Sequence, residues 1–244
     1  MSQSTAPASE TPRVSIVIPI YNEEGILQAS VAGLYEALEE VDWPFEIILS
    51  ENGSKDSTVE LARKLQKRHP TLRLIHSDEP DYGKALRRGI LEARGEIVMC
   101  DEIDLCDVDF YKRAMIELER GADFVVGSKV LDRSLDKRPA YRRAATLVIN
   151  SLLRIFLNFR GTDTHGLKAL RRERVLAVVN KCVVNKDLFA SEMVIRAARM
   201  QLNVVEIPVQ VIEKRQPSIG LARRVPNVLK GIARLTWHIR IRNR

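Results

Sequence analysis

Cysteine is scarce in this 244-residue chain, and its three cysteines are not spaced as metal ligands. Cys100 and Cys106 lie six positions apart beside carboxylates, which matches no standard zinc pattern. An odd number of cysteines cannot all pair within one chain. We therefore interpret these two and Cys182 as reduced thiols of a cytoplasmic protein.

Long apolar runs are also missing, which excludes a membrane-spanning segment. A bilayer-crossing helix needs about 18 or more apolar residues. The nearest candidate, 144–157, is shorter and is interrupted by Asn150 and Arg154. Residues 1–12 are rich in Ser, Thr, Ala and Pro and lack the basic start and apolar stretch of a signal peptide, so we expect a disordered leader there.

Acidic residues are absent from the C-terminal tail. Nine Lys and Arg residues follow Glu213 but no Asp or Glu does, so the net charge of +7 leaves the first 213 residues at −2. Because this body is acidic and contains no recognisable nucleic-acid-binding module, we expect no nucleic-acid partner. We divide the chain into the leader, a domain over 13–213 and a basic tail over 214–244.

The tail has the pattern of an amphipathic helix. Apolar residues stand at 225, 228, 229, 232, 235 and 239, with Lys and Arg between them. Together with Trp237 this pattern suits a helix lying on an anionic membrane surface, which would make the protein peripheral at the cytoplasmic face. The same apolar stripe could equally pack on the domain or on a second subunit of a homo-oligomer.

Buried strands and helices are expected to alternate through the first half of the chain. Apolar β-branched runs predict strands at 14–20, 45–49, 72–75, 96–100 and 124–126, and helical spacing predicts helices at 25–41, 57–68, 84–93 and 110–120. This alternation predicts an α/β fold with an open, mostly parallel sheet and helices on both faces. The second half is less regular, with helices expected at 142–159 and 192–201 and an extended segment at 204–212.

Polar clusters follow four of the expected strands, at 21–24, 50–54, 78–84 and 101–104. Ligands of such sheets bind at the carboxyl ends of the strands, near the point where the strand order reverses. The first strand is followed by no glycine-rich phosphate loop, so a bound diphosphate would need a divalent cation held by carboxylates. Carboxylates two positions apart at a strand end, as in the cluster at 101–104, can approach one ion.

Seven segments occur in an order that is similar to a known family. They are VSIVIPIYNEE (14–24), SENGSKDST (50–58), YGKALRRGILEARGEIV (82–98), DEIDL (101–105), VVGSKV (125–130), GTDTHGLKALRRE (161–173) and EIPVQVIEKR (206–215), and they span about 200 residues. The chain resembles the family 2 glycosyltransferases, and within them the dolichol-phosphate and polyprenol-phosphate sugar transferases. That resemblance implies a GT-A-like fold.

The resemblance also implies roles for residues at matching positions. The donor nucleotide is expected to contact Pro19, Tyr21, Glu23, Glu51, Asn52, Lys84 and Asp101. Mg²⁺ or Mn²⁺ is expected on Glu102 and Asp104, and an acceptor lipid phosphate on Lys129 and Arg142. With Asp163, the residues Asp104, Lys129 and Arg142 make up the expected catalytic set.

Three positions depart from the family pattern. The usual pair of aspartates after the second strand is Glu51-Asn52 here, and Cys106 stands in place of a glutamine. The usual Asp-X-Asp motif is Glu102-Ile103-Asp104, with Asp101 as a rival metal ligand.

The resemblance predicts an inverting, metal-dependent enzyme that moves a hexose from a nucleotide-diphosphate sugar, of GDP-mannose or UDP-glucose type, to a polyprenyl or dolichyl phosphate. A phosphate acceptor is already a nucleophile and needs positioning more than a base. Two alternatives stay open. The acceptor could be a hydroxyl of a glycan or small molecule, for which Asp163 is the candidate base. The protein could also be a nucleotide-sugar-binding or scaffold protein without catalysis.

Overall fold

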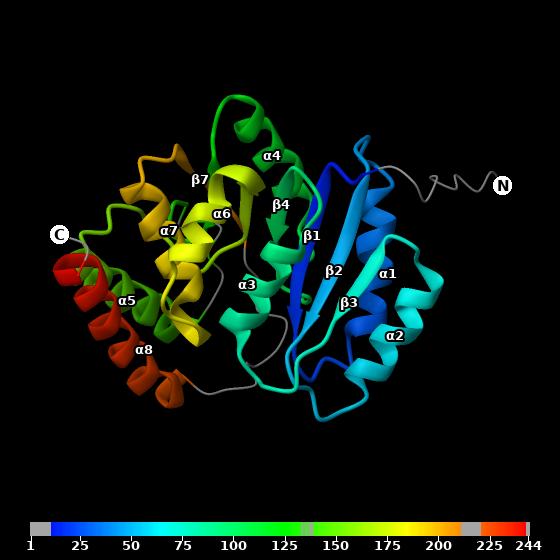
Figure 1. The fold of residues 1–244 in the computed structure, drawn as a ribbon, viewed down its shortest axis with the longest axis horizontal. Coiled ribbons are helices and arrows are strands. Elements are labelled where there is room, and N and C mark those ends of the chain that lie inside the picture. Colours follow the sequence, from blue (N-terminus) through cyan, green and yellow to red (C-terminus); the bar gives the residue numbers. More distant parts are fainter. Residues whose placement is uncertain (1–10, 133, 135, 137–138, 211–220, 243–244) are drawn as a thin grey trace.

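A computed structural model places one seven-stranded sheet between two layers of helices (Figure 1). The structure describes residues 11–132, 134, 136, 139–210 and 221–242, so the expected leader lies almost wholly outside the described residues. The strands are β1 (Val14–Ile20), β2 (Phe45–Glu51), β3 (Leu72–Ile75), β4 (Ile97–Cys100), β5 (Phe124–Ser128), β6 (Lys168–Arg171) and β7 (Val204–Pro208).

The helices follow the order that the spacing predicts through the first half. They are α1 (Leu27–Leu38), α2 (Thr58–Arg68), α3 (Tyr82–Glu92), α4 (Val108–Glu119), α5 (Ala140–Leu157), α6 (Arg172–Lys181), α7 (Phe189–Arg199) and α8 (Leu221–Thr236), with a 3₁₀ turn η1 (Lys186–Leu188) and a π-helical turn η2 (Trp237–Arg242). Each predicted helix and strand is present, with its ends moved by a few residues.

The strands lie in the order β3-β2-β1-β4-β6-β5-β7. The first four are parallel, β6 runs antiparallel to both β4 and β5, and β7 is parallel to β5. The prediction of a mostly parallel sheet is therefore confirmed. All seven residues of β1 are buried, as expected for a central parallel strand covered on both faces.

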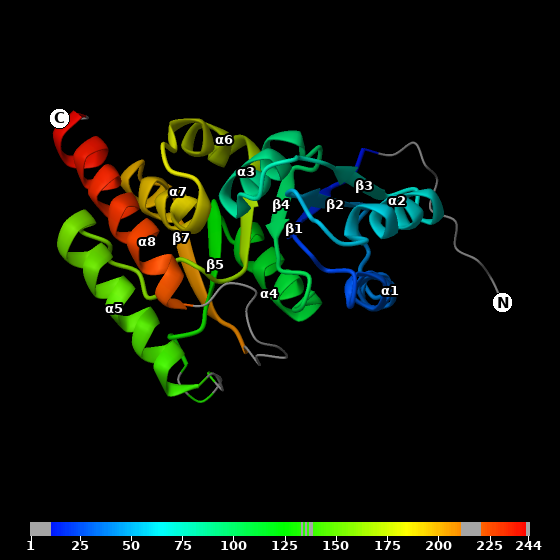
Figure 2. The same ribbon diagram turned by 90° about the horizontal axis from the view of Figure 1, so that it is seen from below.

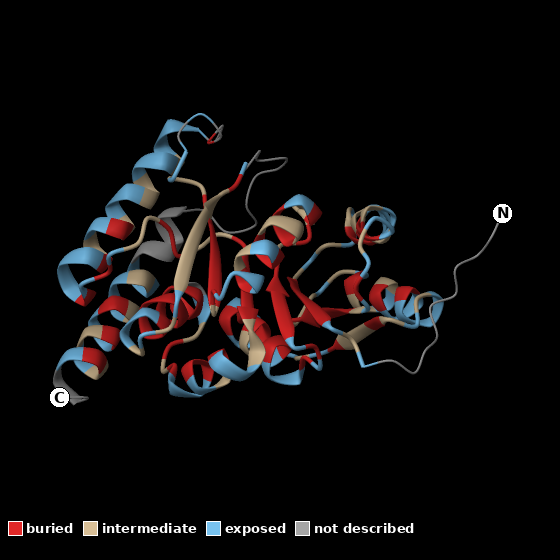
Figure 3. Ribbon diagram, turned by 90° about the horizontal axis from the view of Figure 1, so that it is seen from above, coloured by how far each residue is buried: buried red, intermediate tan, exposed pale blue. Residues whose placement is uncertain are grey.

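Two hydrophobic clusters fill the space on either side of the sheet. The first joins alternate residues of β1 and β2 to α1, α2 and α4. The second joins the opposite face of the sheet to α3, α5, α6, α7 and α8. Figure 3 shows the buried strands between helices whose outer surfaces are exposed, and Figure 2 shows the two helical layers edge-on.

The short strand β6 and the helix α6 are not predicted by the sequence pattern. β6 is the four-residue segment KALR, which starts and ends with a cation and has no alternation long enough to identify a strand. Its antiparallel place is defined by β4 and β5 on either side of it. The segment becomes a strand because two distant parts of the chain offer it hydrogen-bonding edges.

The tail helix α8 belongs to the second cluster. Ile232, Leu235 and Ile239 are buried there, whereas Leu229 and Trp237 stay exposed. The apolar stripe of the tail therefore packs on the domain at these buried positions, which is one of the alternatives that the sequence left open. None of the helices in the described part of the chain combines the length and the apolar character needed to cross a bilayer.

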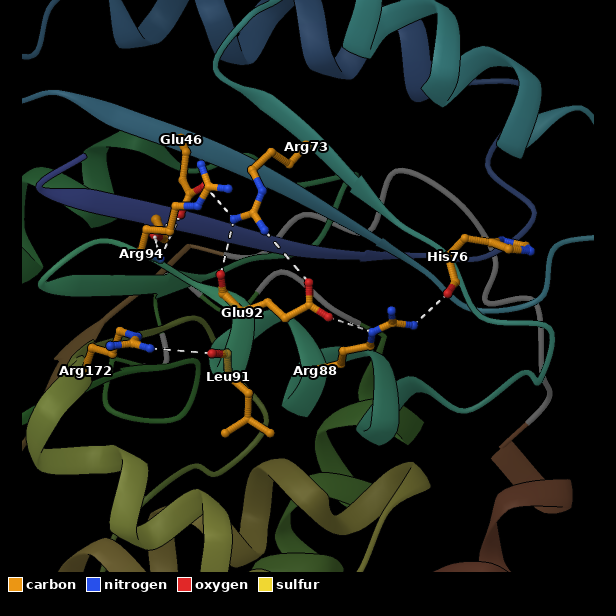
Figure 4. Close-up of polar contacts among 9 residues, drawn as sticks. Glu46, Arg73, His76, Arg88, Leu91, Glu92, Arg94 and Arg172 are labelled. Atoms are coloured by element: carbon orange, nitrogen blue, oxygen red, sulfur yellow. Dashed lines mark hydrogen bonds and ion pairs between the residues drawn. The ribbon is translucent and has the colours of Figure 1, made fainter. Parts of the chain in front are cut away.

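A network of charged side chains fastens α3 to the edge of the sheet (Figure 4). Arg73 on β3 donates to the buried carboxylate of Glu46 at 2.8 Å and to the backbone carbonyl of Glu92 at 3.2 Å. Arg88 bonds the Glu92 carboxylate at 2.9 Å and the backbone carbonyl of His76 at 2.6 Å. These links tie α3 to β2, to β3 and to the loop after β3, while the helix itself packs over β1 and β2.

Candidate active site

Most of the predicted site residues follow the ends of β1, β2, β4 and β5. Lys84 lies instead in α3, Arg142 in α5, and Asp163 in the loop before β6. The strand order reverses between β1 and β4, which are hydrogen-bonded neighbours, because the chain moves outward through β2 and β3 before α3 carries it back. This reversal is the position at which open α/β sheets bind ligands. The loops after these strands therefore supply the walls of the site.

Asp101 organises the acidic loop after β4. It is buried, and its carboxylate accepts hydrogen bonds from the backbone N–H groups of Glu102 at 2.6 Å and Asp107 at 3.0 Å, and from the hydroxyl of Tyr111. Burial raises the pKa of Asp101 to about 7, although these hydrogen bonds favour the charged form. Both carboxylate oxygens of Asp101 accept hydrogen bonds from within the loop, so Asp101 fixes the loop conformation. Glu102 and Asp104, which are carried by this loop, are both half-buried.

A buried cation that the sequence pattern does not predict lies beneath this loop. Lys168 pairs with Cys100 across the β4–β6 ladder, and its ammonium donates to the carbonyl of Gly166 at 2.6 Å. Burial lowers the pKa of Lys168 to about 8, while the charges of Asp163 and Glu102 act in the opposite direction. The only signal in the sequence is a lysine set between apolar residues in the segment GLKAL.

Asp163 is fully buried beside Lys129. Its carboxylate accepts from the backbone N–H groups of His165 at 2.9 Å and Lys129 at 3.3 Å. Burial alone would raise the pKa of Asp163, but the Lys129 ammonium and these N–H groups outweigh it and lower the pKa. The carboxylate is thus held in its charged form and is poorly suited to accept a proton.

Tyr82 is a second residue that sequence reasoning did not select. It begins α3, and although 43% of the residue is exposed, its hydroxyl is desolvated. That desolvation and the nearby charges of Glu102, Asp101 and Asp104 raise the pKa of Tyr82 well above its usual value. The phenol therefore stays protonated and can donate a hydrogen bond next to the acidic loop.

Lys84 lies at the rim of the site. Its backbone N–H is capped by Asp81 at 2.9 Å, and its ammonium pairs with Glu79 at 2.8 Å in an exposed position. This pair joins the first turn of α3 to the loop before it, and that loop also approaches Gly53. A Cβ on Gly53 would meet the backbone carbonyl oxygen of Asp78 at 2.8 Å, and the φ of Gly53 is +79°, so this loop contact requires a glycine.

The residues expected at the nucleotide base hold two loops together. Glu51 is buried, accepts from the backbone N–H of Ser54 at 2.5 Å and pairs with His76 at 2.5 Å. Asn52 is also buried and donates its side-chain amide to the carbonyl of Ile20 at 3.1 Å. Both side chains therefore set the shape of the loop after β2.

The loop after β1 is joined to the same structure. Pro19 lies in β1 opposite Ser50, Tyr21 follows the strand and is half-buried, and the backbone N–H of Glu23 donates to the Thr58 hydroxyl at 2.7 Å. The structure thus brings the loops after β1 and β2 together at one side of the acidic loop.

A hydrogen-bonded chain connects the end of β5 to α5. The hydroxyl of Ser128 contacts that of Thr162 at 2.6 Å, and Thr162 donates from its backbone and its hydroxyl to Glu206 at 2.7 and 2.5 Å. The amide of Asn150, on α5, donates to the Thr162 carbonyl at 2.6 Å. Arg142 is half-buried at the first turn of this helix.

The acidic pair fits a divalent cation that a substrate would help to hold. Across the residues that the structure describes, no three His, Cys, Asp or Glu side chains gather closely enough to bind an ion by themselves. Mg²⁺ is commonly held by one or two carboxylates together with waters and substrate phosphates. Glu102 and Asp104 match that donor set, whereas the oxygens of Asp101 are already used within the loop.

Comparison with known proteins finds a matching family and related sequences. The family model described as glycosyl transferase family 2 matches residues 15–179. The chain is 30% identical to the glycosyltransferase AglD of Haloferax volcanii, over 95% of this chain and 38% of that protein. It is 26% identical to the dolichol-phosphate mannosyltransferase of Pyrococcus furiosus, over 90% of this chain and 60% of that protein. The chain thus spans less than two thirds of either relative.

Two solved structures share the architecture. Glucosyl-3-phosphoglycerate synthase from Mycobacterium tuberculosis, in complex with UDP, superposes with a TM-score of 0.66 at 19% identity, over 94% of this chain and 82% of that one. The mannosyltransferase PcManGT from Pyrobaculum calidifontis, in complex with GDP-Man and Mn²⁺, gives a TM-score of 0.60 at 23% identity, over 93% and 64%. The GT-A-like fold that the sequence predicts is confirmed.

Proposed function

Because the chain belongs to glycosyl transferase family 2, we propose that it transfers a hexose from a nucleotide-diphosphate sugar to a lipid phosphate. One observation carries the proposal. At the point where the strand order reverses, the half-buried carboxylates Glu102 and Asp104 follow β4 directly, and the buried cation Lys168 lies on the neighbouring strand β6, paired with Cys100 at the end of β4. Such a site can hold a metal–diphosphate group and stabilise the charge that develops on it.

The donor end of the site is assigned to the loops after β1, β2 and β4. Pro19, Tyr21 and Glu23 would contact the base, with Glu51 and Asn52 holding their loop in position. Glu102 and Asp104 would bind Mg²⁺ or Mn²⁺ against the diphosphate. The bound ion would act as a Lewis acid on the departing nucleoside diphosphate. The GDP-Man and Mn²⁺ in the complex of PcManGT support a nucleotide sugar and a divalent ion as ligands here.

The state of Asp163 favours a phosphate acceptor over a hydroxyl acceptor. A hydroxyl must lose a proton as it attacks, but the Asp163 carboxylate has a lowered pKa and accepts from two backbone N–H groups. A phosphate monoester is already anionic, so it needs only cations that position it. Lys129, held beside Asp163, and Arg142 are assigned that role, with Asp163 as the positioning residue for Lys129.

A first test removes the proposed metal ligands. Glu102→Gln and Asp104→Asn should each lower transfer by at least ~100-fold, because the ion supplies several kcal/mol of charge stabilisation. The assay measures hexose transfer from UDP-glucose and GDP-mannose to a polyprenyl phosphate, with and without Mn²⁺. Asp109→Asn is the matched control, since this carboxylate pairs with Arg113 on the exposed face of α4. Turnover near wild type in both site variants would remove the assignment.

Nucleotide binding separates the enzyme from a non-catalytic binding protein. A ligand that binds only the native state stabilises it by ~2.7 kcal/mol at a hundred times its dissociation constant. We expect a Mn²⁺-dependent rise in melting temperature with UDP or GDP, and the nucleotide that gives it identifies the donor base. A rise in melting temperature without any turnover would favour the scaffold alternative.

A further inference from the structure

We propose that His76 donates a hydrogen bond to the nucleoside of the donor nucleotide, the contact expected of Glu51, and this inference rests on the proposed use of a nucleotide sugar. His76 directly follows β3, and the pairing of Ser50 with Ile75 in the sheet places it next to Glu51, the last residue of β2. The two side chains differ in their access to solvent. That of His76 is 40% exposed, whereas that of Glu51 is completely buried.

Glu51 is enclosed, and both of its carboxylate oxygens already have partners. One accepts from the backbone N–H of Ser54 at 2.5 Å, and the other contacts Nδ1 of His76 at 2.5 Å. The neighbouring Asn52 is also buried, and its amide donates to the backbone carbonyl of Ile20. A nucleotide at the ends of β1 and β2 therefore meets the exposed ring of His76, while the carboxylate of Glu51 is out of its reach.

The ring of His76 lies between two carboxylates. Its Nδ1 contacts Glu51 at 2.5 Å, and its Nε2 contacts Asp78 at 3.1 Å. A neutral imidazole carries one N–H, so hydrogen bonds to both carboxylates require the imidazolium, which carries two. A buried carboxylate such as Glu51 needs a charged or hydrogen-bonding partner of this kind. These contacts make His76 a cationic N–H donor.

The contact with Asp78 can be exchanged for a contact with a ligand. The side chain of Asp78 is 97% exposed, and an ion pair with such a solvated carboxylate contributes little to stability. The contact with Glu51 is buried at its acidic end and holds the ring in place. An oxygen atom of a bound nucleoside can thus replace the Asp78 carboxylate at Nε2.

The backbone of His76 is also fixed. Its carbonyl accepts from the guanidinium of Arg88 on α3 at 2.6 Å, and its ring is turned away from Arg88 (Figure 4). The backbone N–H of the next residue, Ser77, donates to the carbonyl of Glu51 at 3.1 Å. A side chain that is held in position before binding loses little conformational entropy when a ligand binds.

The sheet places His76 at the nucleoside end of the site. β3, β2 and β1 are consecutive in the sheet, and β4, which leads to the acidic loop, is the next strand. The loops after β1 and β2 are joined, because Asn22 accepts from the backbone N–H of Lys55 at 2.9 Å and donates its own N–H to the Ser54 hydroxyl at 2.9 Å. A nucleotide with its diphosphate at the acidic loop and its nucleoside across these two loops ends at His76.

The chemistry of an N–H donor identifies the ligand atom as an oxygen. The bases carry carbonyl oxygens and the ribose carries hydroxyl groups, so either part of the nucleoside can accept from Nε2. A charge-assisted hydrogen bond of this kind is shorter and stronger than a neutral one. Binding of nucleotides with and without ribose hydroxyls separates the two sources.

Calorimetry of UDP and GDP binding in the presence of Mn²⁺ tests the contact. His76→Phe keeps a planar ring without an N–H and should raise the dissociation constant of the nucleotide that binds by ~10-fold or more. His76→Gln keeps an N–H donor and should recover part of the lost affinity. The matched control is His69→Phe, which should bind as wild type, because His69 precedes β3 at the opposite edge of the sheet and stacks on Tyr35 at 4.2 Å.

Kinetics separates a nucleoside contact from a general effect on the fold. A contact made equally in the ground state and in the transition state affects KM and leaves kcat unchanged. His76→Phe should therefore raise the KM for the sugar nucleotide, while kcat and the KM for polyprenyl phosphate stay at their wild-type values. A lower kcat with an unchanged KM for the sugar nucleotide would contradict the contact.

A second pair of variants allows for the charge that His76→Phe leaves unpaired. The buried carboxylate of Glu51 then lacks its partner, so the melting temperature should fall. Glu51→Gln removes this charge, and Glu51→Gln with His76→Phe should melt at a higher temperature than His76→Phe alone. This double variant should bind nucleotide at least ~3-fold more weakly than Glu51→Gln, as expected for the loss of a neutral hydrogen bond. Equal affinities in this pair would overturn the proposal.

Nucleotides that lack the ribose hydroxyls locate the accepting oxygen. If Nε2 donates to a base carbonyl, His76→Phe should weaken binding of the dideoxynucleoside diphosphate as much as that of the parent nucleotide. If Nε2 donates to a ribose hydroxyl, wild type and His76→Phe should bind the dideoxynucleoside diphosphate alike. Either result, together with weaker binding of the parent nucleotide, supports the contact.

The proposed function can fail separately from this inference. Weaker nucleotide binding by His76→Phe, with no hexose transfer by wild type, would contradict the reaction and leave the contact standing. Nucleotide binding and transfer at wild-type levels in every His76 variant would overturn the contact and leave the reaction standing. A folded wild-type protein that binds neither UDP nor GDP would overturn both.

Discussion

At the scale of single residues, Lys168 is the most consequential charge in the molecule. Its side chain is buried in the sheet, where its ammonium has one carbonyl partner at 2.6 Å and the charges of Asp163 and Glu102 nearby. Burial of an ammonium disfavours its charged form. The site therefore holds a cation at a cost in stability, which is compatible with a role in binding an anionic substrate.

The lowered pKa of Lys168 predicts how stability depends on pH. The folded protein loses this proton near pH 8, while an unfolded lysine keeps it until about pH 10.4. Between these values the unfolded state binds the extra proton, so this group makes stability rise with pH, by at most about 1.4 kcal/mol per unit. Urea unfolding of wild type and Lys168→Met between pH 7 and 9 should show the gain in wild type only. If the stability of wild type and of Lys168→Met changed with pH in the same way, the lowered pKa of Lys168 would be contradicted.

At the scale of elements, one close backbone contact fixes the position of the loop before β6 against β5. A Cβ placed on Gly166 would lie 1.6 Å from the backbone carbonyl oxygen of Gly127. Only a residue without a side chain allows this approach. This contact also fixes the loop that carries Asp163 against the end of β5, which directly precedes Lys129.

Gly166→Ala should therefore be strongly destabilising. Either the backbone of β5 or the loop must move to admit the methyl group, and we expect a loss of more than about 2 kcal/mol. Gly33→Ala is the matched control, because a Cβ at Gly33 in α1 meets nothing within 4 Å. That change should stabilise the helix by up to about 1 kcal/mol. Chemical denaturation measures both, and similar effects of the two changes would refute the close-approach argument.

At the scale of the whole molecule, α8 is part of the core although it lies in the basic tail. Leu235 is fully buried in the second cluster, while Leu229 on the same helix is 52% exposed. The last helix thus completes the layer that also contains α3, α5, α6 and α7. Tail and domain should unfold as one unit.

Leu235→Ala should lower the free energy of unfolding by about 2–5 kcal/mol, because it leaves a cavity in the core. Leu229→Ala should change it by less than about 0.5 kcal/mol, as expected for an exposed position. Guanidinium unfolding followed by Trp fluorescence and by circular dichroism should give coincident transitions in both variants. A separate early transition in wild type would mean that α8 does not belong to the core.

The sequence by itself determined the alternating first half of the fold. A central parallel strand is covered on both faces, so β1 must be apolar at consecutive positions, and such a run is visible without any structure. The acidic loop could be predicted for a related reason, because the carboxyl ends of parallel strands share one edge. That rule places Asp101, Glu102 and Asp104 at this edge, whereas the choice of Glu102 and Asp104 as metal ligands is what the family resemblance implies.

The tertiary structure alone decided the features that depend on distant neighbours. β6 is a strand because β4 and β5 flank it, and only that pairing brings Lys168 under the acidic loop. Both α5 and α8 bury apolar residues in the second cluster, but α5 also keeps Tyr141, Val148 and Ile155 exposed on its other side. Spacing along a helix defines its faces, but which face is covered depends on what the rest of the chain packs against it.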